Sequence, residues 1–299
     1  MSKERYRPTM LDFLILFAIT IFVMYLSYRI RTGIQYRWNW TIIPQYLFHY
    51  DQNRDRWVPN LLMQGFFTTI KISVWATLLS ILLGTSMGIL RTTKSLFNRL
   101  LSRAYVELIR NIPPLVLIFI FYFFISDQIL SLVGLDAIIR SSSRGVQNFV
   151  AILFAPPDQL HAFISGLITL AIYEGAYITE IVRAGIESIE REQWDASYAL
   201  GLSWPQVMRH VILPQSFQRI LPALAGQLVS TIKDSAIVSI ISIQELTFQG
   251  MELMSATYLT FEIWITITAL YFFLTFTCSL TIRRMELYLQ KHGTAYLPA

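Results

Sequence analysis

The chain has 299 residues, of which 54% are hydrophobic and only 14% are charged, with a formal net charge of +5. Soluble domains carry about 25% charged residues, so this composition favours a membrane protein over a soluble enzyme. Its basic residues are scattered at the ends of segments, which argues against nucleic acid as a partner. The single cysteine, Cys278, excludes an intrachain disulfide.

Six apolar segments approach the length of roughly 20 residues that a helix needs to cross the hydrocarbon core. No small-residue cleavage site follows the first segment, so we expect it to remain as a membrane helix. The fifth is the weakest, because Lys233 and Asp234 interrupt it. The expected fold class is an all-α polytopic membrane protein with about six transmembrane helices, at residues 11–28, 61–90, 104–126, 159–182, 220–244 and 263–282.

The distribution of lysine and arginine predicts the orientation of these segments. With the N-terminus in the cytoplasm, fourteen basic residues fall in inner segments, among them Lys3, Arg5 and Arg7, and seven fall in outer ones. Because basic residues are enriched in cytoplasmic loops, we expect a multi-pass protein of the bacterial inner membrane with both termini in the cytoplasm. The polar stretch at residues 187–214 also falls on the cytoplasmic side.

Two regions are expected to be additions to a core at residues 61–284. Residues 1–60 comprise the first helix and an outer loop rich in aromatic side chains, which are common at membrane interfaces. Residues 127–158 form an outer insertion with two apolar patches that are too short to span the membrane. Residues 285–299 form a cytoplasmic tail.

The polar stretch at residues 187–214 predicts two short helices. Residues 187–200 favour a helix that ends at Gly201, which can adopt the left-handed conformation. Ser203 and Gln206 match a capping box that starts a second helix, and Pro214 is expected to stop it.

The stretch could rest on lipid, but its acidic residues would be repelled by anionic headgroups. A groove on another protein is the better partner; the acids are Glu187, Glu190, Glu192 and Asp195.

The spacing within this stretch resembles a known docking loop. The pattern E-A-A, three residues, G, nine residues, I-x-L-P is typical of the cytoplasmic loop by which membrane subunits of bacterial ABC importers bind their ATPase subunits. Three positions differ conservatively from that pattern, with Asp for Glu, Ser for Ala and Val for Ile. The resemblance implies an ATPase-coupling loop that contains Trp194, Asp195, Ala196, Ser197, Gly201, Val211, Leu213 and Pro214.

Flanking segments narrow the resemblance to type I ABC importer permeases of the polar amino acid subfamily, which serves histidine, glutamine, glutamate and general amino acids. They lie at residues 68–73, 105–113, 175–185 and 233–239, within a resemblance that covers residues 62–284. It implies a second permease subunit (identical or homologous), two ATP-binding cassette ATPase subunits, a periplasmic amino-acid-binding protein and surrounding lipid. The alternatives are a permease for another small solute (an opine, cystine or an organic cation) and an ion-coupled carrier.

Two charged residues are expected near the middle of the membrane. Lys71 and Glu174 lie at similar depths, at about 1.5 Å per helical residue. Charges in this position either pair with one another or mark a substrate path. One alternative is therefore a structural ion pair. The other is that Glu174 binds the ammonium group of an amino acid, and the candidate residues for the substrate path are Glu174, Lys71 and Tyr177.

The sequence contains no catalytic or metal-binding constellation. A G-x-x-x-x-G-K-[ST] phosphate-binding loop is absent, and the four histidines are dispersed. We therefore expect a transport subunit that is not an enzyme, without a catalytic residue, a metal or a cofactor of its own. ATP and Mg are expected on the partner ATPase.

Overall fold

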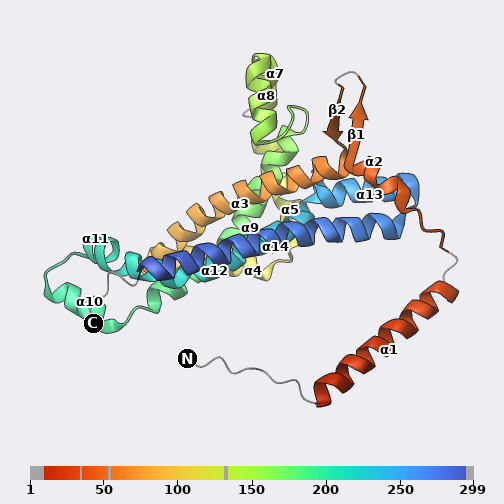
Figure 1. The fold of residues 1–299 in the computed structure, drawn as a ribbon. Coiled ribbons are helices and arrows are strands. Elements are labelled where there is room, and N and C mark those ends of the chain that lie inside the picture. Colours follow the sequence, from red (N-terminus) through yellow and green to blue (C-terminus); the bar gives the residue numbers. More distant parts are fainter. Residues whose placement is uncertain (1–9, 34–35, 53–54, 131–133, 294–299) are drawn as a thin grey trace. The chain divides into compact units, whose positions relative to one another are not determined.

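The computed structural model describes residues 10–33, 36–52, 55–130 and 134–293 (Figure 1). By their internal contacts the residues form two compact units, Met1–Trp40 and Thr41–Ala299. The first unit contains α1 (Met10–Gly33), whose apolar part, Met10–Leu26, is shorter than a spanning helix. Lys3, Arg5 and Arg7, which entered the orientation argument, lie outside the described residues. The functional division at residue 60 and the position of the termini stay predictions.

A β-hairpin stands in the aromatic outer loop, for which no strand was predicted. The short helices η1 (Trp40–Ile42) and α2 (Ile43–Leu47) lead into β1 (Phe48–Asp51), which pairs antiparallel with β2 (Arg56–Pro59). Tyr50 lies opposite Trp57, and their rings meet edge to face with centroids 5.7 Å apart. Such cross-strand aromatic pairs stabilise a hairpin, which explains strands in an otherwise helical chain.

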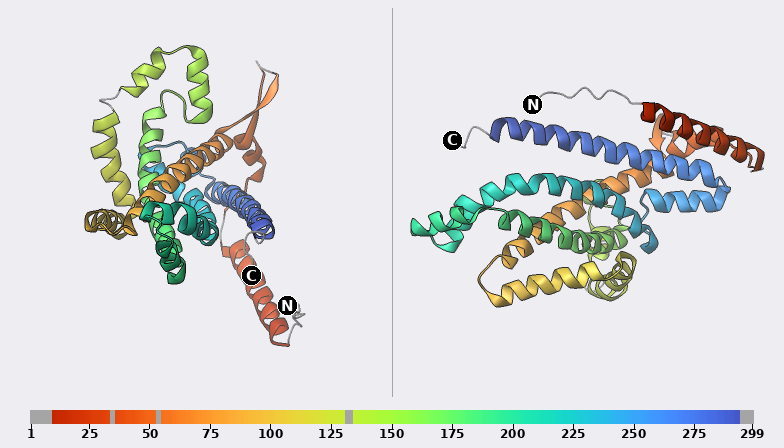
Figure 2. Two further views of the ribbon diagram at one scale, coloured as in Figure 1. Left: turned by 90° about the vertical axis from the view of Figure 1, so that its left-hand side faces the viewer. Right: turned by 90° about the horizontal axis from the view of Figure 1, so that it is seen from below.

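Four helical segments of the described chain are long and apolar enough to cross a membrane, or five if one bent pair counts as a single span. The expected count of about six therefore fits approximately. Neighbouring helices pack side by side, α3 on α9, α9 on α12 and α12 on α14 (Figures 1 and 2). Their bounds are α3 (Leu61–Arg91), α9 (Leu160–Glu187), α12 (Leu213–Asp234) and α14 (Thr260–Gly293).

The predicted span at residues 104–126 is wrong as a single helix. The chain forms α4 (Leu96–Asn111), then bends by 110° into α5 (Pro114–Ile120) and the π-helical η2 (Phe121–Leu130). Ile112 and Pro113 are extended between the two helices. A residue before proline is pushed out of the helical region, and here Pro113 and Pro114 follow one another, so the helix ends before them.

The contact between α3 and α9 depends on two glycines. A Cβ atom added at Gly84 would lie 2.6 Å from Ile178 Cβ, and one added at Gly88 would lie 2.7 Å from Val182 Cβ. Small residues four apart let the backbones of membrane helices approach closely. This contact holds α9 against α3 over two successive turns.

The insertion at residues 127–158 forms two helices, α7 (Leu135–Ser141) and α8 (Arg144–Leu153), that project from the helix bundle (Figure 1). Two hydrogen bonds attach this insertion to α3. Lys71 Nζ donates a 2.7 Å hydrogen bond to the carbonyl oxygen of Ala151, and Trp75 Nε1 donates a 2.9 Å bond to that of Leu153. The ring of Trp75 also stacks on Phe154.

The predicted helix end at Pro214 and the predicted start of the fifth span at residue 220 are both wrong. A continuous helical segment runs over Trp204–Ile241. Within it, the π-helical η3 (Met208–Ile212) passes directly into α12, and Pro214 occupies the first turn of α12. Proline is tolerated in a first turn, because its missing N–H has no intrahelical partner there. After α12, η4 (Ser235–Ile241) ends at Ser242, and α13 (Leu246–Thr257) follows.

Candidate functional site

The predicted docking stretch forms a helical elbow beyond the end of α9. The helix predicted over residues 187–200 is interrupted, because α9 continues to Glu187 and α10 (Arg191–Ala199) begins after a short turn. Gly201 then has φ +75° and α11 (Trp204–Val207) follows. Ser203 and Gln206 form the predicted capping box, in which Gln206 Oε1 accepts a 2.8 Å bond from the Ser203 N–H. We call residues 191–214 the docking elbow.

One side of the docking elbow packs on the bundle. Val207, Met208 and Ile212 are buried against the C-terminal end of α9, in a cluster with Val182 and Ile186. Ser197 is also buried, and its hydroxyl donates to the carbonyl oxygen of Gln193. The elbow is therefore seated on α9, so a force applied to it reaches the spanning helices directly.

The other side of the elbow is free to meet a partner. Among the predicted coupling residues, Asp195, Ala196, Gly201 and Pro214 are exposed. Trp194, Val211 and Leu213 are half-buried at the boundary between the two sides. Leu200 is 79% exposed, although it is large and apolar. The predicted coupling residues therefore fall into an exposed group around Asp195 and a half-buried group next to the bundle. Ser197 is the one member of the set that is fully buried.

Ion pairs that were not predicted from the sequence stabilise the end of α9 that carries the elbow. Glu180 on α9 pairs with Arg91 at the end of α3 and, at 2.9 Å, with Arg183. Arg183 also pairs with Glu187. The spacing of Arg183 from the two glutamates is the helical i,i+3 and i,i+4 spacing, so that part was readable from sequence. The ion pair between Glu180 and Arg91 could not be read from the sequence, since it joins two different helices.

Glu174 is the most deeply buried acid in the middle of a span. It lies 14 residues after the start of α9, about 21 Å along the helix, and its side chain is fully buried. Gln227 of α12 donates a hydrogen bond to its Oε2, whereas Oε1 has no hydrogen-bond partner. Thr231 and Asp234 of α12 lie beside the same carboxyl. A buried acceptor without a donor is costly, so Glu174 is suited to bind a cation.

The other two path candidates have different surroundings. Lys71 is engaged by Ala151 and forms no ion pair with Glu174, so the ion-pair alternative has no support in the described residues. Tyr177 lies one turn after Glu174, with its hydroxyl 3.1 Å from that of Tyr173 and Arg110 5.1 Å from its ring centroid. The structure places Tyr177 near Glu174 along one helix and Lys71 with the insertion.

Lys233 and Asp234, which interrupt the predicted fifth span, are not joined by an ion pair in the described chain. Lys233 is exposed, and Asp234 lies toward Glu174. The two side chains leave the end of α12 in different directions, which adjacent residues of a helix are expected to do.

A second buried acid, Glu245, joins three helices at the opposite end of the bundle from the elbow. Its Oε2 accepts hydrogen bonds from Tyr271 of α14 at 2.7 Å and from Thr69 of α3 at 3.3 Å, and its Oε1 caps α13 by accepting from the Phe248 N–H at 2.8 Å. Burial raises the pKa of this carboxyl. Because both of its carboxyl oxygens already accept hydrogen bonds, we assign Glu245 a structural role.

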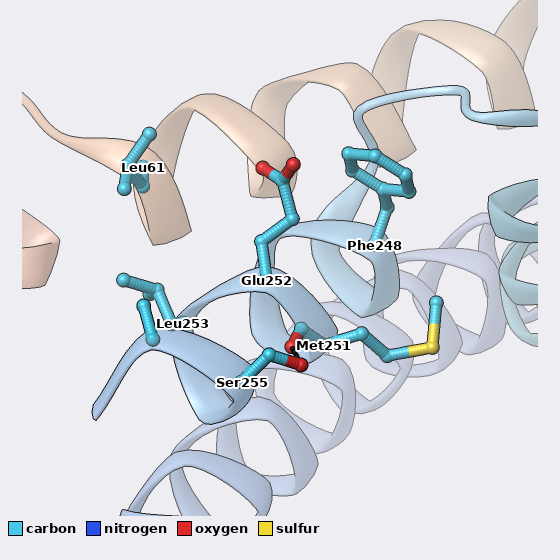
Figure 3. Close-up of a pocket in the computed structure, with 7 residues that line it drawn as sticks. Leu61, Phe248, Met251, Glu252, Leu253 and Ser255 are labelled. Carbon is cyan, nitrogen blue, oxygen red and sulfur yellow. Dashed lines mark hydrogen bonds between the residues drawn. The ribbon is translucent and has the colours of Figure 1, made fainter. Parts of the chain in front are cut away.

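A hollow of about 720 Å³ lies on α13 beside the first residue of α3 (Figure 3). Phe248, Met251, Glu252 and Leu253 line it together with Leu61. None of the predicted site residues contributes to it. The described residues also contain no group of three or more histidines, cysteines or acids that could hold a metal ion.

Comparisons with known proteins identify the family. Residues 80–291 match the family described as the binding-protein-dependent transport system inner membrane component. The chain is 31% identical to the probable glutamine ABC transporter permease protein GlnM of Bacillus subtilis (strain 168), over 78% of this chain and 94% of that protein. It is also 31% identical to the glutamate/aspartate import permease protein GltJ of Escherichia coli (strain K12), over 78% and 87% of the two chains.

Solved structures agree with this family. A crystal structure of an amino acid ABC transporter with histidines matches with a TM-score of 0.63 and 29% identity, over 85% of this chain and all of that one. An inward-facing MetNI methionine ABC transporter matches with a TM-score of 0.56 and 18% identity, which shows the fold alone. The expected type I importer permease fold is confirmed, as is the expectation of a transport subunit rather than an enzyme. The chain belongs to the family of inner membrane components of binding-protein-dependent transport systems.

Proposed function

We propose that this permease imports polar amino acids, and that Glu174 binds the ammonium group of the substrate during translocation. The observation that carries the proposal is the unsatisfied Oε1 of a fully buried carboxylate in the middle of α9. Every amino acid carries an ammonium group, and a charge-assisted hydrogen bond to a carboxylate is strong in a low-dielectric site. The names of the relatives, which refer to glutamine and to glutamate/aspartate, support the same substrate class.

Gln227 orients the proposed site. Its side-chain amide occupies Oε2 of Glu174 and leaves Oε1 as the free acceptor. Tyr177 is the second proposed contact, since it lies one turn after Glu174 on the same helix. Lys71 remains a third candidate for the path, and the carbonyl of Ala151 occupies one of its three hydrogen-bond donors.

The docking elbow is the proposed attachment for an ATP-binding cassette ATPase. Its exposed acid Asp195 and exposed Leu200 offer a charged and an apolar contact to a groove on that partner, while its other side is seated on α9. ATP and Mg bind to the ATPase in this proposal, and the permease binds no cofactor of its own. The elbow then lies in the cytoplasm, and both termini lie on the same side.

A second permease subunit, identical or homologous, and a periplasmic amino-acid-binding protein complete the proposed importer. The binding protein delivers substrate from outside. Closure of the ATPases moves the elbows, and the two permeases open alternately outward and inward around the midplane site. ATP and the binding protein can each drive this cycle only by binding one state more tightly than the other.

The test is uptake into proteoliposomes that contain the permease, its ATPase and its binding protein. We expect labelled glutamine, glutamate or histidine to accumulate only when ATP and the binding protein are both present. Uptake of an opine, cystine or an organic cation instead would show that the permease serves that solute and not polar amino acids. Uptake driven by an ion gradient in the absence of ATP would show that the protein is an ion-coupled carrier and not an ABC importer subunit.

A further inference from the structure

A basic groove lies between the inner end of α3 and the docking elbow. It has a volume of about 320 Å³, and its wall includes Arg91, Arg99, Arg191 and Trp194 over a floor that contains Ile186. We infer that this groove binds the phosphate of an anionic phospholipid headgroup from the inner leaflet. The regulatory consequence rests on the proposed docking role of the elbow, whereas the lipid site itself does not.

The charges around the groove are not balanced within the chain. Arg91 is paired with Glu180, and the one acid that lines the groove, Glu187, is paired with Arg183. Arg99 and Arg191 take part in no side-chain hydrogen bond or ion pair within the described part of the chain. Two arginines without an acid therefore face a space large enough for a headgroup. Arginine is the side chain best matched to phosphate, because its planar group donates two parallel hydrogen bonds.

The position of the groove favours a lipid over a free anion. The 31 residues of α3 extend for about 46 Å, longer than the roughly 30 Å hydrocarbon core. The end of α3 at Arg91 therefore reaches the headgroup region. On α4, beside Arg99, the side chains of Leu96, Phe97 and Leu100 are 62%, 72% and 54% exposed. Acyl chains would cover these apolar side chains while the phosphate meets Arg99, and a free phosphate would leave them in water.

The lipid would link the bundle to the coupling machinery. Arg99 lies on α4, whereas Arg191 and Trp194 lie on α10 of the docking elbow. A phosphate held by both arginines joins two residues that lie 92 positions apart in the sequence. The bound headgroup therefore restrains the elbow relative to α4, and transport coupling becomes dependent on anionic lipid.

The first experiment measures lipid retention by native mass spectrometry on the full-length permease without its ATPase. Arg99→Gln and Arg191→Gln are compared singly and together, with Arg103→Gln as the control. Arg103 is exposed on the same helix, but Glu107 pairs with it at 2.7 Å and it does not line the groove. Loss of one charge-assisted hydrogen bond weakens binding by about tenfold. We expect each single variant to bind phosphatidylglycerol about tenfold more weakly and the double variant to lose it, while the control retains it.

Three outcomes would overturn the inference. The first is equal retention of phosphatidylglycerol by the wild-type chain and the double variant. The second is equal occupancy by phosphatidylcholine, or displacement of the lipid by millimolar inorganic phosphate, which would indicate a non-specific or free-anion site. The third comes from a second experiment, copurification of the ATPase with the same variants. Loss of the ATPase from the double variant without loss of lipid would assign the arginines to the ATPase interface. Failure of the wild-type permease to recruit an ATPase would contradict the proposed function and leave the lipid measurement intact.

Discussion

The ammonium group of Lys71 on α3 donates a 2.7 Å hydrogen bond to the carbonyl oxygen of Ala151 in the last turn of α8. The carbonyls of a last helical turn lack intrahelical donors, and the negative end of the helix dipole favours a cation there. Trp75, one turn further along α3, satisfies the carbonyl of Leu153 in the same way. These two side chains attach the insertion to the core, which accounts for a lysine in a spanning helix without an acidic partner.

Replacing Lys71 by methionine keeps the length of the side chain and removes its charge. Loss of a hydrogen bond from a charged group costs about 1.5–3 kcal/mol when the site is buried, and less at this half-buried position. We expect amide hydrogen exchange in α8 to accelerate by about tenfold, while exchange in α9 is unchanged. Lys233→Met is the control, since Lys233 is exposed and has no ion pair among the described residues. Unchanged amide exchange in α8 would show that the hydrogen bond from Lys71 to Ala151 does not hold the insertion in place.

Glu174→Gln tests the proposed substrate site. The substitution preserves size but removes the negative charge that meets the ammonium group, a loss of about 1.5–3 kcal/mol for one hydrogen bond to a charged group. We expect uptake and substrate-stimulated ATPase activity to fall by tenfold or more, with normal assembly. Glu252→Gln, at an exposed position on α13, is the control and retains activity. Unaltered uptake kinetics in Glu174→Gln would remove this residue from the path.

Two substitutions in the docking elbow test the attachment of the ATPase. Asp195→Lys reverses the charge of an exposed residue, and Gly201→Val places a β-branched side chain at φ +75°, which costs about 1–2 kcal/mol. We expect both variants to insert in the membrane but to copurify with little ATPase. Glu252→Lys makes a similar charge change on α13, far from the elbow (Figure 1), and we expect it to recruit the ATPase normally. Full recruitment by both elbow variants would refute the docking role.

Gly84→Ala tests the close contact between α3 and α9. The added methyl group would lie 2.6 Å from Ile178 and 2.8 Å from the carbonyl oxygen of Gly175, and overpacking of this kind costs about 1–3 kcal/mol. We expect a lower unfolding temperature, followed by the reaction of a thiol-specific dye with Cys278, the only cysteine. At Gly226 an added Cβ meets nothing within 4 Å, so Gly226→Ala serves as the control and is expected to be neutral or slightly stabilising. Equal unfolding temperatures for the two variants would contradict the importance of the contact.

The features that could be predicted from the sequence depend on interactions over a few residues. The capping box of Ser203 and Gln206 and the left-handed turn at Gly201 involve partners within one helical turn, so the residue types are sufficient to specify them. Hydropathy identified the spans near residues 61–90, 159–182 and 263–282 for the same reason, because each helix satisfies its own backbone in lipid. Pro214 was misjudged because the preceding π-helical turn leads straight into α12, and proline fits the first turn of a helix as well as it ends one.

The partners of Lys71 and Glu174 lie far away along the chain and depend on how the helices pack. Lys71 meets Ala151 and Glu174 meets Gln227, pairs separated by 80 and 53 residues. Helical periodicity gives the depth of a charge in the membrane but not which neighbour faces it. That choice follows from the approach of α3 to α9 at Gly84 and of α12 to α9, which leaves one oxygen of Glu174 without a donor and holds Lys71 at the end of α8.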